Sequence, residues 1–251
     1  EISSCPTVFA VNQLDHQGAN FNDSVNSLKE YFGDKVTVIQ YPVSIGEGFN
    51  TIIDLMLMKQ LKFNNNGGEP EISDIPDSEK DKADDLHLTL VENAAEGDEK
   101  LMEKYFENDT LTLEEMREGV RLGMISRSIF PVMCTSAKSG IGATRVMDFI
   151  TNSCPAPNEM PERETTNGKA FKTSTSDPTA LFVFKTSIEQ HLGEVSCFKL
   201  YGGTLTEGMD LINPRTGNKE RLSQFFVLNG KNREKIEKVV AGDIAITIKL
   251  K

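Results

Sequence analysis

The sequence is poor in residues that bind metals or form cross-links. Its four cysteines are far apart with no C-x-x-C pair, and its three histidines have no acidic or cysteine neighbours at ligand spacing. A zinc site or a disulfide framework is therefore disfavoured, and we expect reduced, mostly buried thiols and solvated or locally hydrogen-bonded histidines. No serine, histidine and aspartate arrangement suggests a nucleophile, so we assign no catalytic residue and no metal ligand. The residues concerned are Cys5, Cys134, Cys154, Cys197, His16, His87 and His191.

Long apolar runs are also lacking. The most apolar stretch, "TIIDLMLM" at 51–58, is interrupted by Asp54 and is too short to span a membrane. The first residues, "EISSCPTV", show no basic region followed by an apolar segment, so no signal peptide is visible. We therefore expect a cytoplasmic protein with no membrane partner.

The chain also lacks an excess of positive charge. The formal net charge is −11, with 27 Lys and Arg against 38 Asp and Glu. Such a chain does not bind nucleic acid or an anionic membrane through its overall charge, although a local basic patch remains compatible with it. No sequence-specific nucleic-acid partner is expected.

The residues that are present favour an α/β fold in the first part of the chain. With 251 residues, 38% of them hydrophobic, the chain can form one large domain or two ordinary ones. Val8–Val11 predicts a buried strand, residues 19–33 predict a helix that stops at Gly33, and 35–42 predicts a second strand that ends at Pro42. Strand, helix, strand is the order found in parallel sheets.

The middle of the chain is less regular. We expect a polar loop at 64–81 and acidic helices within 79–107. Thr112 followed by Glu115 predicts a capping box that starts another helix. A buried strand is predicted at 129–137 and a helix at 143–153. This alternation continues the α/β pattern.

The last third has a different character. Residues 155–178 are rich in Pro, Thr, Ser, Asn and charge, which predicts a linker. Beyond it, short strand-like runs are separated by Gly, Asn and Pro, and the last of them alternates apolar and other residues from Ile244 to Leu250. We interpret residues 180–251 as a small all-β barrel, and the chain as two domains.

Two loops that each follow a predicted strand carry the candidate ligand-binding residues. The first, Asn12-Gln13-Leu14-Asp15, nearly spells N-K-x-D, the element with which guanine-nucleotide-binding proteins read the base. Its aspartate can accept two hydrogen bonds from adjacent donors of guanine, whereas adenine offers an acceptor there. Taken alone, N-x-x-D after a strand is better explained as an Asx turn that caps the next helix.

The second loop is Ser136-Ala137-Lys138, within "CTSAKSGIG" at 134–142. It matches the S-A-K loop of guanine sites, where backbone N–H groups donate to the keto oxygen and the lysine stem covers the base or sugar. The alternative is that Ser136 and Lys138 cap a surface helix. Because both elements follow strands and occur in the expected order, the pair favours a guanine site.

These loops lie within a longer resemblance to elongation factor G, the translational GTPase of ribosomal translocation. It is carried by "PTVFAVNQLDHQGANF", "IQYPVSIGEGFNTIIDL", "LTLEEMREGVRLGMISRSIFPVMCTSAKSGIGATRVMDFITNSCPAP" and "FKLYGGTLTEGMDLIN". The resemblance implies part of a G domain at 1–155, mostly parallel with an inserted α/β subdomain at about 43–128, then a linker at 156–179 and the barrel of domain II at 180–251. It implies GTP or GDP as ligand, the ribosome as a partner of the intact protein, and guanine-binding roles for Asn12, Gln13, Asp15, Ser136, Ala137 and Lys138.

Two departures from the family pattern qualify this expectation. Gln13 replaces lysine, which removes a charge and one methylene near the base, so we expect weak or altered nucleotide use. No G-x-x-x-x-G-K-[ST] occurs, so this chain is expected to be a fragment that does not hydrolyse GTP alone, with magnesium bound only in the intact protein. A ribosome-binding paralogue with lost hydrolysis, or a ribosomal-protection or release-factor relative, remains an alternative.

Two surface expectations follow from the same resemblance. Without preceding strands, the edge at Val8–Val11 is expected to associate or to be disordered. Basic residues gather in the predicted barrel, where they either contact ribosomal RNA or form an ordinary soluble surface. They are Lys219, Arg221, Lys231, Arg233, Lys235 and Lys238.

Overall fold

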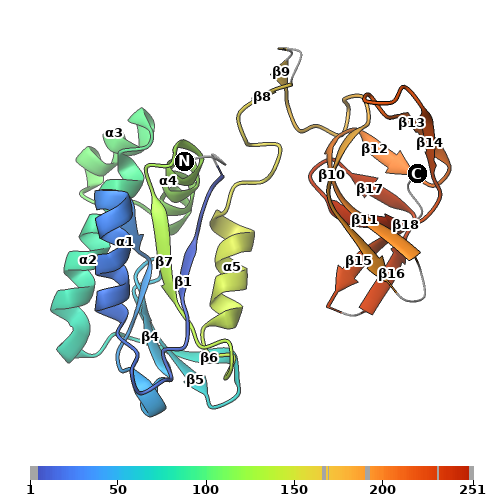
Figure 1. Cartoon of the computed structure of the whole chain (residues 1–251). Coiled ribbons are helices and arrows are strands. Elements are labelled where there is room, and N and C mark those ends of the chain that lie inside the picture. Colours follow the sequence, from blue (N-terminus) through green and yellow to red (C-terminus); the bar gives the residue numbers. More distant parts are fainter. Residues whose placement is uncertain (1–4, 166–167, 169, 190–192, 231, 249–251) are drawn as a thin grey trace. The chain divides into compact units, whose positions relative to one another are not determined.

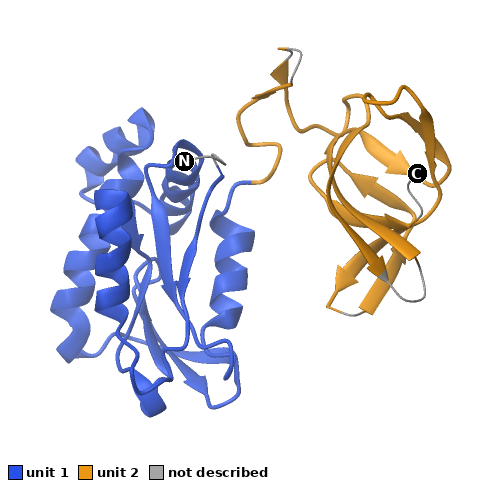
Figure 2. Cartoon of the chain, viewed as in Figure 1, with its two compact units in different colours: residues 1–155 blue, residues 156–251 orange. Residues whose placement is uncertain are grey.

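The structure is a computed structural model that describes residues 5–165, 168, 170–189, 193–230 and 232–248. The chain divides into two compact units, a first unit of residues 1–155 and a second unit of residues 156–251 (Figure 2). His191, Lys231 and the end of the last predicted strand, Lys249 and Leu250, lie outside the described residues. No helix of the described ranges is long and apolar enough to cross a membrane.

The first unit combines helices with two sheets (Figure 1). A parallel sheet has the strand order β1-β7-β2, and an antiparallel sheet has the order β3-β4-β5-β6. The predicted α/β class is confirmed, although the parallel part comprises only the three strands of the first sheet. The elements are β1 (Phe9–Val11), α1 (Phe21–Phe32), η1 (Gly33–Lys35), β2 (Val36–Val38), β3 (Gln40–Pro42), η2 (Gly46–Gly48), β4 (Thr51–Asp54), β5 (Lys59–Asn64), β6 (Gly67–Ser73), α2 (Asp77–Ala95), α3 (Glu99–Asn108), α4 (Leu113–Ser126), β7 (Phe130–Cys134) and α5 (Ala143–Ser153).

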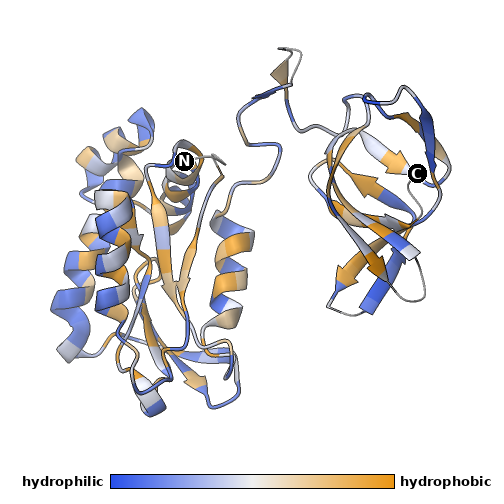
Figure 3. Ribbon diagram, viewed as in Figure 1, coloured by the Kyte–Doolittle hydropathy of each residue, from blue (hydrophilic) through white to orange (hydrophobic). Residues whose placement is uncertain are grey.

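The predicted helices form where local signals start and stop them. Asn20 caps α1 by accepting a hydrogen bond from the Asp23 N–H, and Gly33 follows α1 at a φ of 68°. Thr112 and Glu115 form the predicted capping box of α4. Figure 3 shows hydrophilic residues on the outer turns of α2 and hydrophobic residues on β1 and β7, the pattern of an amphipathic shell around a sheet.

The prediction of one strand at 35–42 is wrong, because this run contributes to both sheets. β2 pairs with β7 in the parallel sheet, whereas β3 pairs with β4 in the antiparallel sheet. Ile39 lies between them, buried, and its N–H donates to the Val132 carbonyl at 2.9 Å. A continuous β-branched run carries no local sign of such a change of partner.

The predicted polar loop at 64–81 is also wrong. Residues Lys59–Asn64 and Gly67–Ser73 form a hairpin with the two-residue turn Asn65-Asn66, and α2 already begins at Asp77. β6 lies at the edge of its sheet and is largely exposed, so it lacks the apolar alternation that identifies a half-buried strand.

β1 occupies the predicted place but is not buried as predicted. Ala10 is exposed and Phe9 and Val11 are half-buried. In the described part of the chain β1 pairs with β7 alone, so it is an edge strand. Association through this edge stays a prediction.

The second unit is built from antiparallel strands. Its largest sheet has the order β10-β11-β18-β15-β16, and further pairs are β12-β17, β13-β14 and β8-β9. Phe198 and Phe225 form the centre of its core, with ring centroids 6.2 Å apart and edge to face. The strands are β8 (Arg163–Glu164), β9 (Ala170–Phe171), β10 (Ala180–Glu189), β11 (Gly193–Gly202), β12 (Thr204–Thr206), β13 (Met209–Ile212), β14 (Lys219–Leu222), β15 (Phe225–Asn229), β16 (Asn232–Ile236), β17 (Lys238–Val240) and β18 (Ile244–Ile248).

Part of the segment at 156–179 packs on this antiparallel unit. The Gly203 N–H donates to the Ser174 carbonyl at 2.8 Å. A Cβ at Gly202 would lie 2.7 Å from the ring of Phe171, so the aromatic side chain rests directly against the backbone of β11. These contacts tie residues 171–174 to the end of β11 and to Gly203.

Candidate functional site

The two candidate loops leave adjacent parallel strands at the same edge of the sheet. Val11 and Cys134 are paired in register, and the Thr135 N–H donates to the Val11 carbonyl at 2.9 Å. The side-chain oxygen of Asn12 accepts from the Ala137 N–H at 2.9 Å. The structure therefore brings the two loops together, and Asn12 ties one to the other. The carboxyl end of parallel strands is where open α/β sheets place their ligands.

The first loop is a tight turn with one buried anchor. Leu14 is 1% exposed, and its carbonyl accepts from the Gly46 N–H at 2.7 Å. Gln13 has a φ of 63°, the left-handed region that non-glycine residues seldom adopt. The alternative that this stretch caps the next helix is wrong, because Asn20 caps α1.

The second loop is held by its own hydrogen bonds. Ser136 is fully buried, its N–H donates to the Ile141 carbonyl at 2.9 Å, and its hydroxyl accepts from the Ser139 N–H at 3.4 Å. Gly142, not Ser136 or Lys138, occupies the N-cap of α5, and it makes no side-chain cap bond. The helix-capping alternative is therefore wrong for this loop too. Ala137 and Lys138 are exposed.

The loops border two neighbouring hollows. A cleft of about 560 Å³ is lined by Asp15 and Lys138, and a smaller hollow of about 200 Å³ is lined by Asn12 and Gln13, with His16 bordering both. Asp15 is half-buried. Ser136 and Ala137 line neither hollow; Ala137 bonds to Asn12 and Ser136 bonds to Ser139 within the loops. The other residues that line the cleft are Gln17, Glu47, Phe49, Asn65, Ser139 and Ile141.

Glu47, Phe49 and Asn65 were not predicted as site residues. They belong to η2, to the residue after it, and to the β5–β6 turn. Their place beside Asp15 is set by the antiparallel sheet and its docking on the second loop. No motif or spacing in the sequence links them to the two loops.

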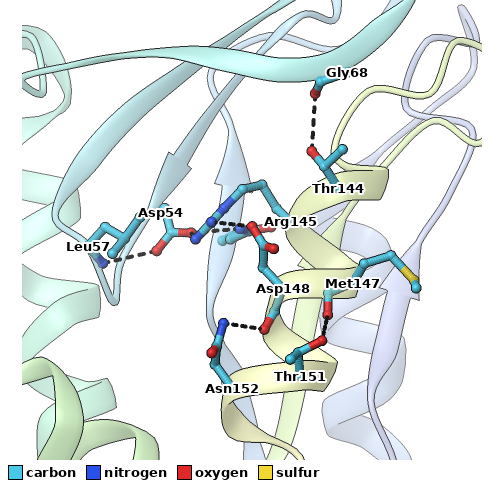
Figure 4. Close-up of polar contacts among 10 residues, drawn as sticks. Asp54, Leu57, Gly68, Thr144, Arg145, Met147, Asp148, Thr151 and Asn152 are labelled. Carbon is cyan, nitrogen blue, oxygen red and sulfur yellow. Dashed lines mark hydrogen bonds and ion pairs between the residues drawn. The ribbon is translucent and has the colours of Figure 1, made fainter.

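A polar network fixes the start of α5, directly after the second loop (Figure 4). Asp54 is 2% exposed and accepts hydrogen bonds from the Met56 and Leu57 N–H groups at 3.1 and 3.0 Å. Its carboxylate also pairs with Arg145 at 3.2 Å, and Arg145 reaches Asp148 at 2.8 Å. The first turn of α5 is thereby anchored to β4.

The cysteines and histidines do not build a second site. Cys134 is buried, Cys154 and Cys197 are half-buried and Cys5 is exposed, so the prediction of mostly buried thiols is wrong. Burial raises the pKa of Cys134 well above its usual range. The His16 ring accepts a local hydrogen bond from the Gly18 N–H at 3.1 Å, as expected, whereas the His87 ring is hydrogen-bonded to the distant Leu55 carbonyl at 2.7 Å. Across the described ranges, no group of three His, Cys, Asp or Glu side chains could hold a metal ion.

A comparison with protein families shows which known domain the second unit is similar to. Residues 178–251 match the family model of elongation factor G domain 2. This segment of the chain is similar to domain 2 of elongation factor G. The resemblance to elongation factor G seen in the sequence is thereby confirmed.

A solved structure extends the likeness over both units. The chain is similar to a protein from Thermus thermophilus known from its crystal structure, with a TM-score of 0.80 and 24% sequence identity. The match covers 97% of this chain and 34% of that protein. The chain therefore has the fold of about a third of the Thermus protein. For the first unit, this likeness shows the fold alone.

Proposed function

We propose that the loops after β1 and β7 bind the base of a guanine nucleotide, as part of an elongation-factor-G-like translational GTPase. The observation that carries the proposal is the bond between Asn12 and the Ala137 N–H, which joins the two guanine-type motifs at one edge of a parallel sheet. The elongation factor G domain in the same chain supports it. In this proposal residues 180–251 form the closed barrel of domain II, and residues of about 43–128 form an inserted subdomain of the G domain.

Asp15 is the proposed reader of guanine. It lines the larger cleft, where its carboxylate can accept from the two adjacent donors of the guanine edge. Adenine presents an acceptor at one of these positions, so its complex leaves a polar group unpaired. Such a mismatch costs about 1–3 kcal/mol.

Backbone N–H groups of the second loop are the proposed partners of the keto oxygen. The Ala137 N–H is occupied by Asn12, and the Ser139 N–H by the Ser136 hydroxyl. The Lys138 N–H has no partner among the residues that the structure describes, so it is the donor we assign to the guanine oxygen. The Lys138 stem, which lines the same cleft, is placed to cover the base or sugar.

In this proposal the chain recognises the guanine base but does not hydrolyse GTP. It contains no G-x-x-x-x-G-K-[ST] with which to hold phosphates. GTP hydrolysis, magnesium binding and movement on the ribosome are assigned to the intact protein. The second candidate function is that of a relative in which Gln13 accompanies the loss of GTP hydrolysis. The intact protein would then bind the ribosome without hydrolysing GTP.

A ribosome contact through the second unit is the accompanying part of this proposal. Lys219 and Arg221 are exposed on β14, which belongs to the family-matched segment. Lys235 instead pairs with Glu207 at 2.9 Å, so part of the basic charge predicted for RNA contact is neutralised locally. Lys219 and Arg221 are therefore the basic residues we favour for a phosphate contact.

The test uses nucleosides, because they carry the base without phosphates. The isotope-labelled chain is titrated with guanosine and with adenosine, and amide shifts are followed by NMR. We expect guanosine to shift the signals of Leu14, Asp15 and Lys138 at lower concentration than adenosine does. Asp15→Asn should remove this preference, whereas Asp84→Asn, which changes an exposed carboxylate on α2, should leave it intact. Equal responses to both nucleosides in the unaltered chain would contradict the proposal.

A further inference from the structure

The turn of the β5–β6 hairpin lies directly against the second candidate loop. A Cβ placed on Gly67 would lie 2.5 Å from both the carbonyl carbon and the oxygen of Gly140. A Cβ on Gly140 would lie 3.3 Å from the carbonyl oxygen of Asn66. The two backbones therefore touch with no side chain between them, and this contact sets the distance between the hairpin and the loop.

A side-chain hydrogen bond holds the hairpin at the same place. The Thr144 hydroxyl, in the first turn of α5, donates to the Gly68 carbonyl at 3.1 Å (Figure 4). Gly67 and Gly68 have φ values of 69° and 85°, a conformation that favours glycine. The sequence "NNNGG" thus makes a turn that is narrow enough to reach the loop.

The same turn borders the cleft that contains Asp15 and Lys138. Asn65 is exposed and lines this cleft. Phe49 and Ile141, each 3% exposed, contribute apolar surface to it, which suits a flat purine. Asn65 offers both a donor and an acceptor, the chemistry needed for the polar edge of a nucleoside.

We propose that the β5–β6 turn is a third element of the nucleotide cleft, with Asn65 in contact with the bound purine nucleoside and Gly67 as a positioning residue. Gly67 acts through Gly140 by holding the loop of Ser136–Gly142 where Lys138 faces the cleft. This inference rests on the proposed function. It makes the antiparallel sheet of the first unit part of ligand recognition.

The positioning role of Gly67 is tested against its neighbour. Gly67→Ala and Gly68→Ala introduce the same methyl group at a positive φ in the same turn, but a Cβ on Gly68 meets nothing within 4 Å. We expect Gly67→Ala to weaken guanosine binding about fivefold or more and to reduce the preference over adenosine. Gly68→Ala should stay within about twofold of the unaltered chain. Melting curves of both variants separate a change at the loop from a loss of folding.

The ligand contact of Asn65 is tested in the same way against Asn66. Both asparagines are exposed in the same turn, but only Asn65 lines the cleft. Asn65→Ala should weaken guanosine binding about two- to tenfold, as expected for the loss of one hydrogen bond. Asn66→Ala should leave the affinity unchanged. Equal effects of the two substitutions would overturn the contact.

The outcomes separate this inference from the proposed function. If the unaltered chain prefers guanosine but Gly67→Ala and Asn65→Ala match their controls, the inference is wrong and the guanine site stands. If the unaltered chain shows no preference, the guanine site is wrong, and the nucleoside contact of Asn65 falls with it. The positioning role is still decided without ligand, because Gly67→Ala must shift the amide signals of residues 136–142 more than Gly68→Ala does.

Discussion

The two units of this chain differ in what identifies them and in what they can do. The second unit matches elongation factor G domain 2, but none of the predicted guanine-binding residues lies in it. The first unit contains both candidate loops and the cleft, and its likeness to a solved structure rests on fold at 24% identity. The family match therefore applies to residues 178–251, whereas the proposed site in the first unit has to be judged on its own geometry.

The units also differ in how their apolar residues are packed. The described core of the first unit is continuous across both sheets and their helices, from Leu14 to Phe149. The described core of the second unit is much smaller and centres on Phe198 and Phe225, while Phe182 on β10 is 60% exposed. A small core depends more on each of its members, so the largest effects of single substitutions are expected in the second unit.

Phe225→Ala should be the most damaging of the changes considered. Phe225 is fully buried against Phe198, and removing a buried phenyl ring costs about 3–5 kcal/mol. We expect the amide signals of the second unit to collapse under mild denaturant while those of the first unit and its guanosine response persist. Val227→Ala, at a 43% exposed position of the same strand, is the control. If the guanosine response were lost when the second unit unfolds, the proposal that the first unit alone binds the base would be wrong.

Asp54→Ala is the corresponding test in the first unit. The carboxylate is buried and paired with Arg145, and removing one partner of a buried pair costs about 3–5 kcal/mol. We expect the lower end of that range, because Arg145 keeps Asp148 as a partner. Urea unfolding followed by amide signals of α5 measures the loss. Asp148→Ala, at the half-exposed end of the network, should cost under about 1 kcal/mol; an equal loss in both variants would contradict the anchoring role of Asp54.

A pH-dependent effect is expected at the start of α4. The Lys104 ammonium, together with the N–H and hydroxyl groups of Thr112, lowers the pKa of Glu115 from 4.5 to about 2. Because the folded pKa is depressed, this stabilisation is present above about pH 4.5 and is lost as the pH falls towards 2. Glu115→Gln should flatten the pH dependence of unfolding in this window. Glu114→Gln changes a largely exposed carboxylate that pairs with Arg117 in the same helix, and it should keep the slope.

The fold could be predicted from the sequence where the signals are local. The stop of α1 at Gly33 and the capping box of α4 depend on residues within a few positions of one another. The division of 35–42 at Ile39 and the hairpin at 59–73 depend on pairing with distant strands. Pairing with distant strands cannot be detected from the residue pattern of a short sequence segment, so the sequence does not predict these elements.

The candidate site could be predicted only in part for the same reason. Asn12, Asp15 and Lys138 lie in motifs that follow strands, and parallel pairing of β1 and β7 brings those motifs together. Asn65 reaches the cleft through the close contact of Gly67 with Gly140, and Glu47 follows Gly46, whose N–H donates to the Leu14 carbonyl. The contact of Gly67 with Gly140 joins the backbones of two segments that lie far apart in the sequence. No residue type at either position predicts it.

The smallest expected effect concerns Gln13, the position where the guanine motif departs from its family pattern. Gln13→Lys restores a positive charge beside the smaller hollow without adding a β-branch to a residue that already has a φ of 63°. An exposed charge contributes under about 1 kcal/mol, so we expect guanosine and GDP to bind about two- to fivefold more tightly in an NMR titration. Gln224→Lys adds the same charge at an exposed position of the second unit and should change neither affinity. A gain confined to Gln13→Lys sharpens the assignment of nucleotide binding to the first unit, whereas no gain would show that the missing lysine is not what sets this protein's nucleotide affinity.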